Sequence, residues 1–378
     1  MQPKHFNVKL TVETPIHIGN AEFYTPTDYD IQGNEFYVID QKKFLKKISS
    51  DRMLYNDFLK KCGEFTLNNR ELLDFIRHEA KNLYKYTVKI DEKAKDYITR
   101  DPGKISRALI DKFIRNNLDD TVYIPGSTIK GAIRSSIIEV IFGKLLNIKE
   151  DLCNKKSDKR EKILESINPK KQERNKEEKK TRIIETILNS YLGFDAKYDI
   201  LKYVLVSDFS PIIAETQICF PVNKVNDNQN HHIKALLECV MPKSSFEGTI
   251  TFKKEFFDNF NKLLDKIKQE VKDFPLEEFN KENYKDFNKK TLEKWIRAHY
   301  KDKVYHCERI KNKINYLDND CLVKLGKHAG AVSKTVAGLR EIKTRSRGEL
   351  KTQFSQTSFW YVDNKPMGWV RVEFNLVS

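Results

Sequence analysis

The segment Tyr123–Arg134 reads Tyr-Ile-Pro-Gly-Ser-Thr-Ile-Lys-Gly-Ala-Ile-Arg, and it decides how the middle of the chain folds. Pro125-Gly126 is typical of a loop, and Ser127 is a residue type that caps the start of a helix. The apolar residues that follow recur at helical spacing, namely Ile129, Ala132, Ile133, Ile137, Val140 and Ile141. The segment therefore predicts a loop and then a helix that starts at Ser127 and stops near Gly143.

This loop and helix start have the features of an anion-binding site. Amide groups in the first turn of a helix lack partners inside the helix, and the helix dipole adds partial positive charge there. Lys130 and Arg134 are four residues apart, so they share one flank of the first turns. We expect a phosphate to bind at Gly126, Ser127, Thr128, Lys130 and Arg134. The alternative is an ordinary buried helix with two solvated cations.

The composition favours a polyanionic partner. The chain has 378 residues, of which 39% are hydrophobic, so it can form a sizeable core. Lys and Arg number 69 against 54 Asp and Glu, which gives a net charge of +15. Nucleic acid is the usual partner of such a charge, and an anionic membrane is the competing one. Because we find no membrane-spanning apolar run and no signal peptide, we expect a cytoplasmic protein without a membrane partner.

Several kinds of chemistry lack their motifs. The six cysteines are scattered without a Cys-x-x-Cys pair, which argues against disulfides and zinc. His231 and His232 are adjacent and cannot share a helix face as metal ligands. Neither Gly126–Gly131 nor Gly326–Gly330 has the spacing of a nucleotide-hydrolase phosphate loop. We therefore expect no metal site and no NTP hydrolysis.

Two histidines leave a catalytic alternative open. His17 and His328 each follow an expected strand in a glycine-containing loop. Metal-independent RNA cleavage needs a general base and a general acid, and histidine suits both roles. The sequence does not show whether the two residues meet. We prefer the interpretation that they bond locally or touch RNA without chemistry.

The order of expected elements favours an α+β fold, because strands and helices are interspersed without regular alternation. We expect two ferredoxin-like (RRM-like, split βαβ) modules with charged helical insertions. They are residues 1–200, with a highly charged insertion at about 149–182, and residues 201–378, with a helical insertion at about 255–316. Strands are expected at 6–12, 35–40, 86–90, 202–206, 236–240, 248–252 and 321–325, helices at 44–59, 67–83, 105–114, 183–192, 256–271 and 292–299, and a closing hairpin between 359–362 and 369–374.

A basic cluster followed by aromatic residues marks the C-terminal part of the chain. The cations are Arg340, Lys343, Arg345, Arg347 and Lys351, and the aromatic residues are Phe354, Phe359, Trp360, Tyr361 and Trp369. Cations bind the nucleic-acid backbone, and aromatic faces can stack on unpaired bases. We expect most of the aromatic residues to lie in the core and the cations to contact RNA.

Four blocks of sequence together resemble the RAMP superfamily of CRISPR-associated proteins: Thr14–Asn20, Tyr123–Arg134, Val206–Asp208 and Pro366–Val370. The second block is similar to the superfamily's most distinctive motif. The first and last blocks most resemble the family of fifth subunits of the Csm series, which cap the 3′ end of the guide RNA in type III-A effector complexes. The loop Gly326–Gly330 has fewer glycines than the corresponding loops of many RAMP proteins.

The resemblance implies a pair of RRM-like modules, no cofactor, and a position at one end of a helical ribonucleoprotein in antiviral defence. The family member supports maturation or protection of the 3′ end of the guide RNA (crRNA) without cutting the target. The implied partners are crRNA, with target RNA as a further candidate, the neighbouring backbone RAMP subunits, and the small helical subunit of the Csm complex.

Together these observations predict a non-catalytic RNA-binding subunit. The predicted phosphate site on the helix start would be continued by seven residues along the RNA path: His17, Asn20, Lys327, His328, Lys334, Arg345 and Arg347. One alternative is a metal-independent endoribonuclease that acts on crRNA precursor through His17 or His328. Another is a protein adaptor whose basic charge is incidental to its composition.

Overall fold

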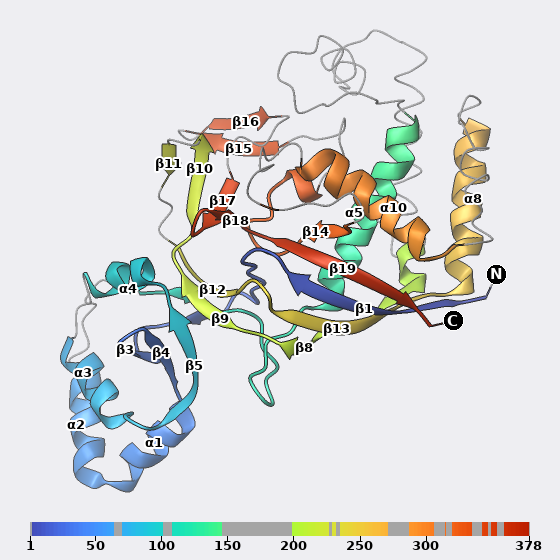
Figure 1. Cartoon of the computed structure of the whole chain (residues 1–378). Helices are drawn as coiled ribbons and strands as arrows, with labels where there is room; N and C mark the ends of the chain where they lie inside the picture. Colours follow the sequence, from blue (N-terminus) through green and yellow to red (C-terminus); the bar gives the residue numbers. More distant parts are fainter. Residues whose placement is uncertain are drawn as a thin grey trace.

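The structure is a computed structural model of the whole chain, shown in Figure 1. It describes residues 2–63, 70–100, 108–145, 199–226, 229–231, 235–270, 287–305, 314, 320–334, 342–346, 349–353 and 359–377. Strands and helices are mixed along these residues, so the predicted α+β class is confirmed. The strands form two large sheets and two small ones.

The first large sheet combines both ends of the chain with its middle. Its strands are β1 (Lys4–Val12), β7 (Val204–Val206), β8 (Ser210–Ile213), β13 (Ser245–Phe252), β14 (Leu322–Lys324) and β19 (Trp369–Leu376). Their order is β14-β19-β1-β13-β7, and β8 also pairs with β13. Along β1, Phe6, Val8, Leu10 and Val12 are buried, and the residues between them are more exposed. Because side chains alternate along a strand, only one face of this sheet packs against the core.

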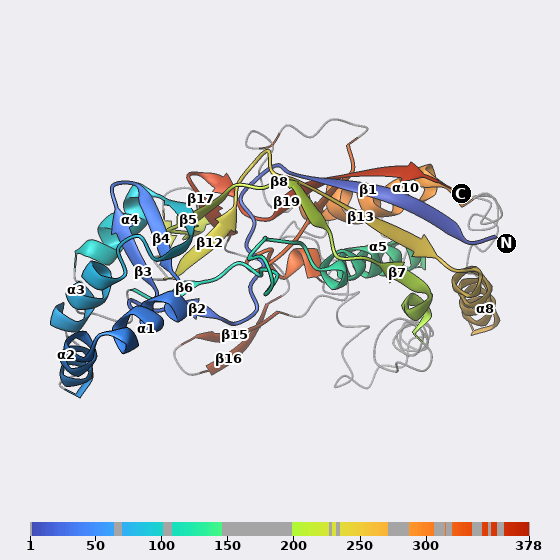
Figure 2. The ribbon, with the colours of Figure 1, turned by 90° about the horizontal axis from the view of Figure 1, so that it is seen from below.

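Three helices cover the buried face of the first sheet, as Figures 1 and 2 show. They are α5 (Gly126–Leu145), α8 (Lys254–Glu270) and α10 (Lys289–His299). Their apolar side chains join those of the sheet in the largest core, where the rings of Phe260 and Trp295 stack at 5.6 Å. Three short helices flank them: η2 (Ile200–Tyr203), η4 (Tyr300–Tyr305) and η5 (Val332–Lys334). The helices predicted at 256–271 and 292–299 are confirmed in their described parts.

The second large sheet occupies the lower left of Figure 1. Its strands are β2 (Phe23–Tyr24), β3 (Tyr29–Gln32), β4 (Glu35–Ile39), β5 (Tyr84–Ile90), β6 (Ile110–Asp111), β9 (Thr216–Cys219) and β12 (Leu236–Val240), in the order β2-β6-β12-β9-β5-β4-β3. It carries α1 (Gln41–Ser50), α2 (Arg52–Gly63), α3 (Arg70–Glu79) and α4 (Glu92–Thr99). The Asp40 and Asp91 carboxylates cap α1 and α4 by accepting bonds from backbone amides.

The two small sheets include the chain just before the last strand. One contains β10 (Val222–Asn226), β11 (Gln229–His231), β17 (Phe359–Val362) and β18 (Lys365–Pro366), and the other contains β15 (Ile342–Ser346) and β16 (Glu349–Gln353). The predicted pairing of 359–362 with 369–374 is wrong. Asp363 and Asn364 have positive φ angles and form a tight turn, so β17 pairs with β18, while β19 joins the first sheet.

Two other predictions from local pattern are wrong. Residues 108–114 are not helical, because Ile110 and Asp111 pair in parallel with β12 and the Phe113 amide donates to Glu238 (3.0 Å). Residues 202–203 belong to η2 rather than to a strand, because the Asp199 carboxylate caps this short helix through the Leu201 amide (2.9 Å). In both places tertiary and capping contacts outweigh the local hydrophobic period.

Neither large sheet is confined to one side of the domain boundary predicted near residue 200. In the first sheet β1 pairs with β13 and β19, and in the second β5 pairs with β9. The charged insertion predicted at 149–182 and the helix predicted at 183–192 lie outside the described residues. Among the helices of the described ranges, none has the length and apolar character needed to cross a bilayer.

Candidate functional site

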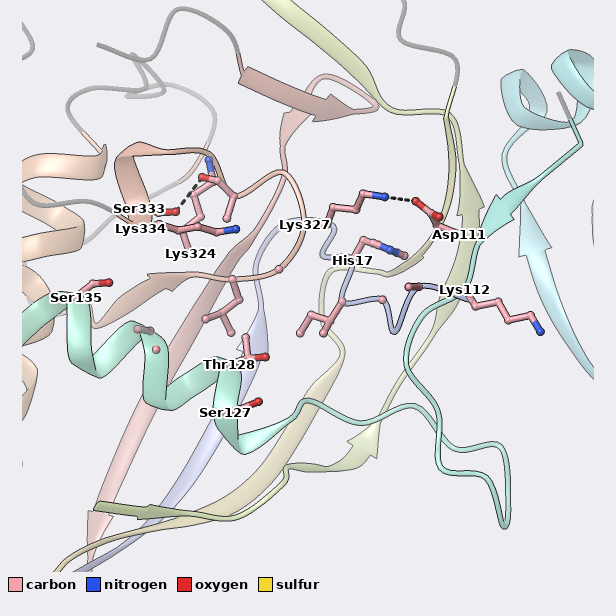
Figure 3. A pocket seen from close by; sticks show the side chains of 18 of the residues that line it. His17, Asp111, Lys112, Ser127, Thr128, Ser135, Lys324, Lys327, Ser333 and Lys334 are labelled. Atoms are coloured by element: carbon pink, nitrogen blue, oxygen red, sulfur yellow. Dashed lines mark hydrogen bonds and ion pairs between the residues drawn. The ribbon is translucent and has the colours of Figure 1, made fainter. Parts of the chain in front are cut away.

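A cavity of about 670 Å³ lies where the two large sheets meet, and Figure 3 shows it from close by. Its walls come from the loop after β1, the end of β6, the start of α5, and the loop between β14 and η5. Residues that line it include His17, Asp111, Thr128, Lys327, Ser333 and Lys334. Segments that are far apart in the sequence therefore form one concave surface.

The first and last of the four sequence blocks hold each other beside this cavity. The Gly368 amide donates to the Pro15 carbonyl (2.9 Å), and the Trp369 amide donates to the Thr14 hydroxyl (2.9 Å). The Thr14 amide donates in return to the Trp369 carbonyl (3.2 Å). These bonds fix the loop after β1 against the start of β19, and so they fix the position of His17.

The loop between β14 and η5 is anchored on the backbone of His17. The Lys327 amide donates to the His17 carbonyl (2.8 Å). Gly326 has a φ of +86°, and a Cβ there would collide with the same carbonyl oxygen. Glycine is required at this position because it adopts the conformation and permits the approach. The turn places the Lys327 side chain in the cavity (Figure 3).

The second and third sequence blocks meet at the start of α5. The helix begins at Gly126, one residue before the predicted start, so Ser127 lies in the first turn and is not the N-cap. The Gly126 amide donates to the Asp208 carboxylate (2.8 Å), and the Thr128 amide donates to the Pro125 carbonyl (2.9 Å). Two of the first three helix amides therefore already have acceptors, which differs from the free amides expected from the sequence.

His17 is a buried, oriented side chain in the cavity wall. Only 1% of the residue is exposed, and its Nδ1 lies 2.7 Å from the Glu238 carbonyl oxygen. The ring meets Phe113 edge to face at 6.2 Å. Burial lowers the pKa of His17 below its ordinary value, and the Glu238 carbonyl only partly offsets this effect. His17 is therefore a neutral ring near pH 7.

Charge in the cavity is mainly positive but contains one close ion pair. Lysines at four positions line it, namely Lys112, Lys324, Lys327 and Lys334, together with the carboxylates Glu22 and Asp111. Lys327 reaches across to pair with Asp111, as the dashed line in Figure 3 marks. Lys334 is exposed and has no ion pair among the residues that the structure describes. The cavity thus offers cations to an anionic ligand.

Lys130 and Arg134 lie on a different flank of α5 from the cavity-lining residues of that helix. The cavity is lined by Ser127, Thr128 and three later residues of α5 but not by these two cations. Arg134 pairs with Asp199 at 2.5 Å. Lys130 is half-buried, and this burial lowers its pKa from the ordinary value. Their predicted contact with RNA stays a prediction.

Neither His328 nor Asn20 lines the cavity. His328 has a φ of +65° and stacks on Trp360 at 3.8 Å, and burial lowers its pKa to about 3. Asn20 is exposed, and its side chain accepts a bond from the Glu22 amide (3.2 Å). Arg345 lies on β15, where only the backbone is described, and Arg347 lies outside the described residues.

Several residues of this site were not singled out in the sequence. The cavity is also lined by Asp111, Lys112, Lys324 and Ser333. Glu238 does not line it but contacts His17 through its carbonyl oxygen. The Glu238 carboxylate accepts bonds from the Tyr24 hydroxyl (2.9 Å) and the Phe113 amide (3.0 Å), and it pairs with Arg115. No motif marks these residues. Within strand β12, a glutamate flanked by Leu236, Leu237, Cys239 and Val240 was the one available signal.

Metal binding has no support in this part of the molecule. Among the described residues, no group of three His, Cys, Asp or Glu side chains is placed to hold a metal ion. The arrangement of lysines and hydroxyls around an open cavity suits an anionic ligand instead.

Comparison with known proteins places the chain in a family. The RAMP superfamily model matches residues 9–310, so this chain belongs to the RAMP superfamily, and the resemblance stated from the sequence is confirmed. Its relatives include proteins named "CRISPR system Cms protein Csm5". The one from Methanocaldococcus jannaschii is 27% identical over 336 residues, which cover 87% of this chain and 72% of that protein.

Two further Csm5 relatives match over a shorter part of their length. The protein from Streptococcus thermophilus is 32% identical over 138 residues, which cover 35% of this chain and 38% of that protein. The protein from Enterococcus italicus is 30% identical over 160 residues, which cover 36% and 43% respectively.

Solved structures share the fold over nearly the whole chain. A chain in the cryo-EM structure of a Csm–crRNA–target RNA ternary complex from a type III-A CRISPR-Cas system has a TM-score of 0.58 at 15% identity, with 97% of this chain and 100% of that chain covered. The crystal structure of T. onnurineus Csm5 has a TM-score of 0.56 at 18% identity, with 96% and 99% covered. At these identities the likeness concerns the fold.

Proposed function

We propose that this protein is a non-catalytic RNA-binding subunit of a type III-A CRISPR (Csm) effector ribonucleoprotein. In this role it caps the crRNA 3′ end and supports crRNA maturation and complex assembly in antiviral defence. The observation that carries the proposal is the lysine-lined cavity of a RAMP-superfamily chain whose relatives are named Csm5. The proposed partners are crRNA, target RNA, the backbone RAMP subunits and the small helical subunit, in the cytoplasm.

The chemistry of the cavity supports binding of an RNA backbone. Lys327 and Lys334 are exposed enough to meet phosphates, and Figure 3 shows Ser127 and Thr128 on the first turn of α5 facing the same space. Hydroxyl groups can bond both phosphate oxygens and ribose hydroxyls, while lysines supply salt-dependent affinity. We propose that the RNA path runs from the start of α5 past His17 and Lys327 to Lys334.

We infer that the first sheet and its helices form one ferredoxin-like module. The chain order β1, α5, β7, β13, α8 with α10, β19 is the β-α-β-β-α-β order of such modules, and these strands lie as β19-β1-β13-β7. The module draws residues from both predicted domains, 1–200 and 201–378. A second module of this type stays a proposal.

The environment of the histidines favours binding over cleavage. A general acid near pH 7 works best with a pKa near that pH, whereas burial lowers the pKa of His17 and lowers that of His328 to about 3. His328 also does not line the cavity and stacks on Trp360 instead. We therefore propose that neither histidine cuts crRNA precursor, which incubation of labelled precursor without divalent metal would test.

The binding proposal is tested by removing two cavity lysines from the full-length protein. Lys327→Gln with Lys334→Gln should weaken binding of a labelled oligouridine RNA by about tenfold or more, because two phosphate contacts are lost. The slope of log affinity against log salt should fall by about 1.4, since each contact with a single strand contributes about 0.7. Fluorescence anisotropy over a salt series measures both quantities.

Two matched pairs of substitutions complete this test. Lys42→Gln with Lys46→Gln removes the same charge from exposed positions on α1 and should change affinity by about twofold or less. Lys130→Gln with Arg134→Gln tests the flank of α5 separately. Equal losses in the α1 pair and in the cavity pair would contradict a binding site in the cavity.

A further inference from the structure

One acidic side chain interrupts the basic lining of the cavity. Asp111 lies at the end of β6 with 11% of its side chain exposed, and its carboxylate pairs with the Nζ of Lys327. The Lys327 side chain is 48% exposed. The pair therefore joins a mostly buried anion to a cation that an incoming ligand can reach (Figure 3).

The two partners differ in how firmly they are held. Asp111 lies opposite Leu237 on β12 and Phe23 on β2, so its strand is paired on both sides. Lys327 is held by its backbone at the His17 carbonyl, and its ammonium ends a flexible four-carbon side chain that is 48% exposed. When Lys327 turns toward a ligand, Asp111 cannot follow and stays in the wall of the cavity.

We propose that the Lys327–Asp111 pair is an exchangeable ion pair that keeps single phosphates out of the cavity and yields only to an RNA chain. This inference rests on the proposed function and adds Asp111 as a residue that sets how many contacts a ligand must make in order to bind. It concerns the class of ligand that the cavity accepts rather than the path of the RNA.

The physical reason is competition between a tethered and a free anion. Asp111 is fixed beside Lys327, so it competes at a high effective concentration. A phosphate that takes Lys327 also leaves the Asp111 carboxylate unpaired next to its own negative charge. A mononucleotide has few other contacts to offset this cost. An RNA chain can bind Lys334, Ser127 and Thr128 at the same time.

The experiment uses the full-length protein, a labelled oligouridine RNA and uridine monophosphate as competitor. Asp111→Asn keeps the shape of the side chain and removes its charge. We expect this variant to bind RNA about tenfold more tightly. The inhibition constant of uridine monophosphate should also be about tenfold lower, because the exchange cost applies to both ligands. In the Lys327→Gln background, Asp111→Asn should raise the affinity for each ligand by about twofold or less, because Asp111 no longer has a lysine partner.

A matched variant separates exchange from general charge. Glu22→Gln removes one carboxylate from the same cavity, and Glu22 has no ion pair within the described part of the chain. Its expected gain is about twofold or less. The inference would be overturned if Glu22→Gln raised ligand affinity as much as Asp111→Asn does. It would also be overturned if Asp111→Asn raised affinity equally in the presence and absence of Lys327.

Three further outcomes bear on the inference. If circular dichroism shows that Asp111→Asn does not fold, Asp111→Ser and the half-exposed Lys327→Gln replace it, and unchanged RNA affinity in Lys327→Gln overturns the exchange. If the wild type binds RNA but Asp111→Asn does not raise the affinity for either ligand, this inference fails and the proposed function stands. If the wild type does not bind RNA, the proposed function and this inference both fail.

Discussion

His328 illustrates how packing sets the chemistry of a single residue. In the sequence it is a loop histidine suited to acid–base work. In the structure it has a φ of +65°, stacks on Trp360, and has a buried Nε2 without a hydrogen-bond partner in the described structure. Burial is the main cause that lowers its pKa to about 3, and the nearby Lys327 charge adds to it. The folded protein therefore favours the neutral ring.

This lowered pKa predicts a pH dependence of stability. Between its ordinary value of 6.5 and about 3, His328 takes up a proton in the unfolded chain but not in the folded one. The contribution of His328 to the free energy of unfolding is therefore fully present above pH 6.5. It falls on acidification by on the order of 1 kcal/mol per pH unit. His328→Phe keeps a ring on Trp360 and should flatten the dependence. Urea unfolding at pH 7.5 and 5.5 measures it.

The exposed His78 provides the control for this measurement. Its side chain is 82% exposed, so His78→Phe makes the same change at a histidine that is not buried. If His328→Phe and the wild type lose the same unfolding free energy between the two pH values, burial of His328 does not control the profile.

At the scale of elements, the start of α5 shows why a glycine and an aspartate belong together. Gly126 packs against the backbone at the end of β7, and a Cβ there would lie 2.5 Å from the carbonyl oxygens of Val206 and Ser207. The same close approach brings the Asp208 carboxylate to the Gly126 amide. The helix is thus capped by a residue that is distant in sequence rather than by Ser127.

Two glycines of the same helix predict opposite effects of alanine. Gly126→Ala should lower the free energy of unfolding by about 1–3 kcal/mol, because helix and strand must move apart. Gly131→Ala should raise it by up to about 1 kcal/mol, since a Cβ there meets nothing within 4 Å and alanine favours helices. Chemical denaturation measures the free energy of unfolding of both variants. An equal change in this free energy for the two would contradict the close approach of α5 to β7.

At the scale of the whole molecule, Glu238 links the second sheet to the cavity. Its carbonyl orients His17, which follows strand β1 of the first sheet, and its fully buried carboxylate pairs with Arg115, which follows strand β6 of the second sheet. Ile16, which follows β1, and Val240, at the end of β12, also exchange backbone hydrogen bonds of 3.0 and 2.9 Å. The cavity therefore depends on how the two sheets are joined.

Removing this link should cost stability and binding together. Glu238→Ala leaves the largely buried Arg115 without its counter-ion, and we expect a loss of about 3 kcal/mol in unfolding free energy. RNA affinity should fall as well, because the Phe113 amide loses its acceptor beside Asp111 and Lys112, which line the cavity. The exposed Glu247→Ala on β13 is the control for both measurements. A Glu238 variant as stable as this control would argue against the link.

The sequence by itself determined many of the local elements and the superfamily. The alternation along 6–12 and the helical spacing after Pro125-Gly126 report which face of each element is buried, and this information is present in short windows. The four blocks sufficed to recognise the RAMP superfamily. Five residues that the sequence analysis assigned to RNA binding line one cavity, and their contact with RNA stays a prediction: His17, Ser127, Thr128, Lys327 and Lys334.

Only the tertiary structure decided which partner each element and each charge takes. Strand β19 pairs with β1 rather than with β17, Asp208 caps α5, Asp199 pairs with Arg134, and Asp111 pairs with Lys327. These contacts join residues tens to hundreds of positions apart. Local periodicity carries no record of them, because they depend on how the sheets and loops come together in space.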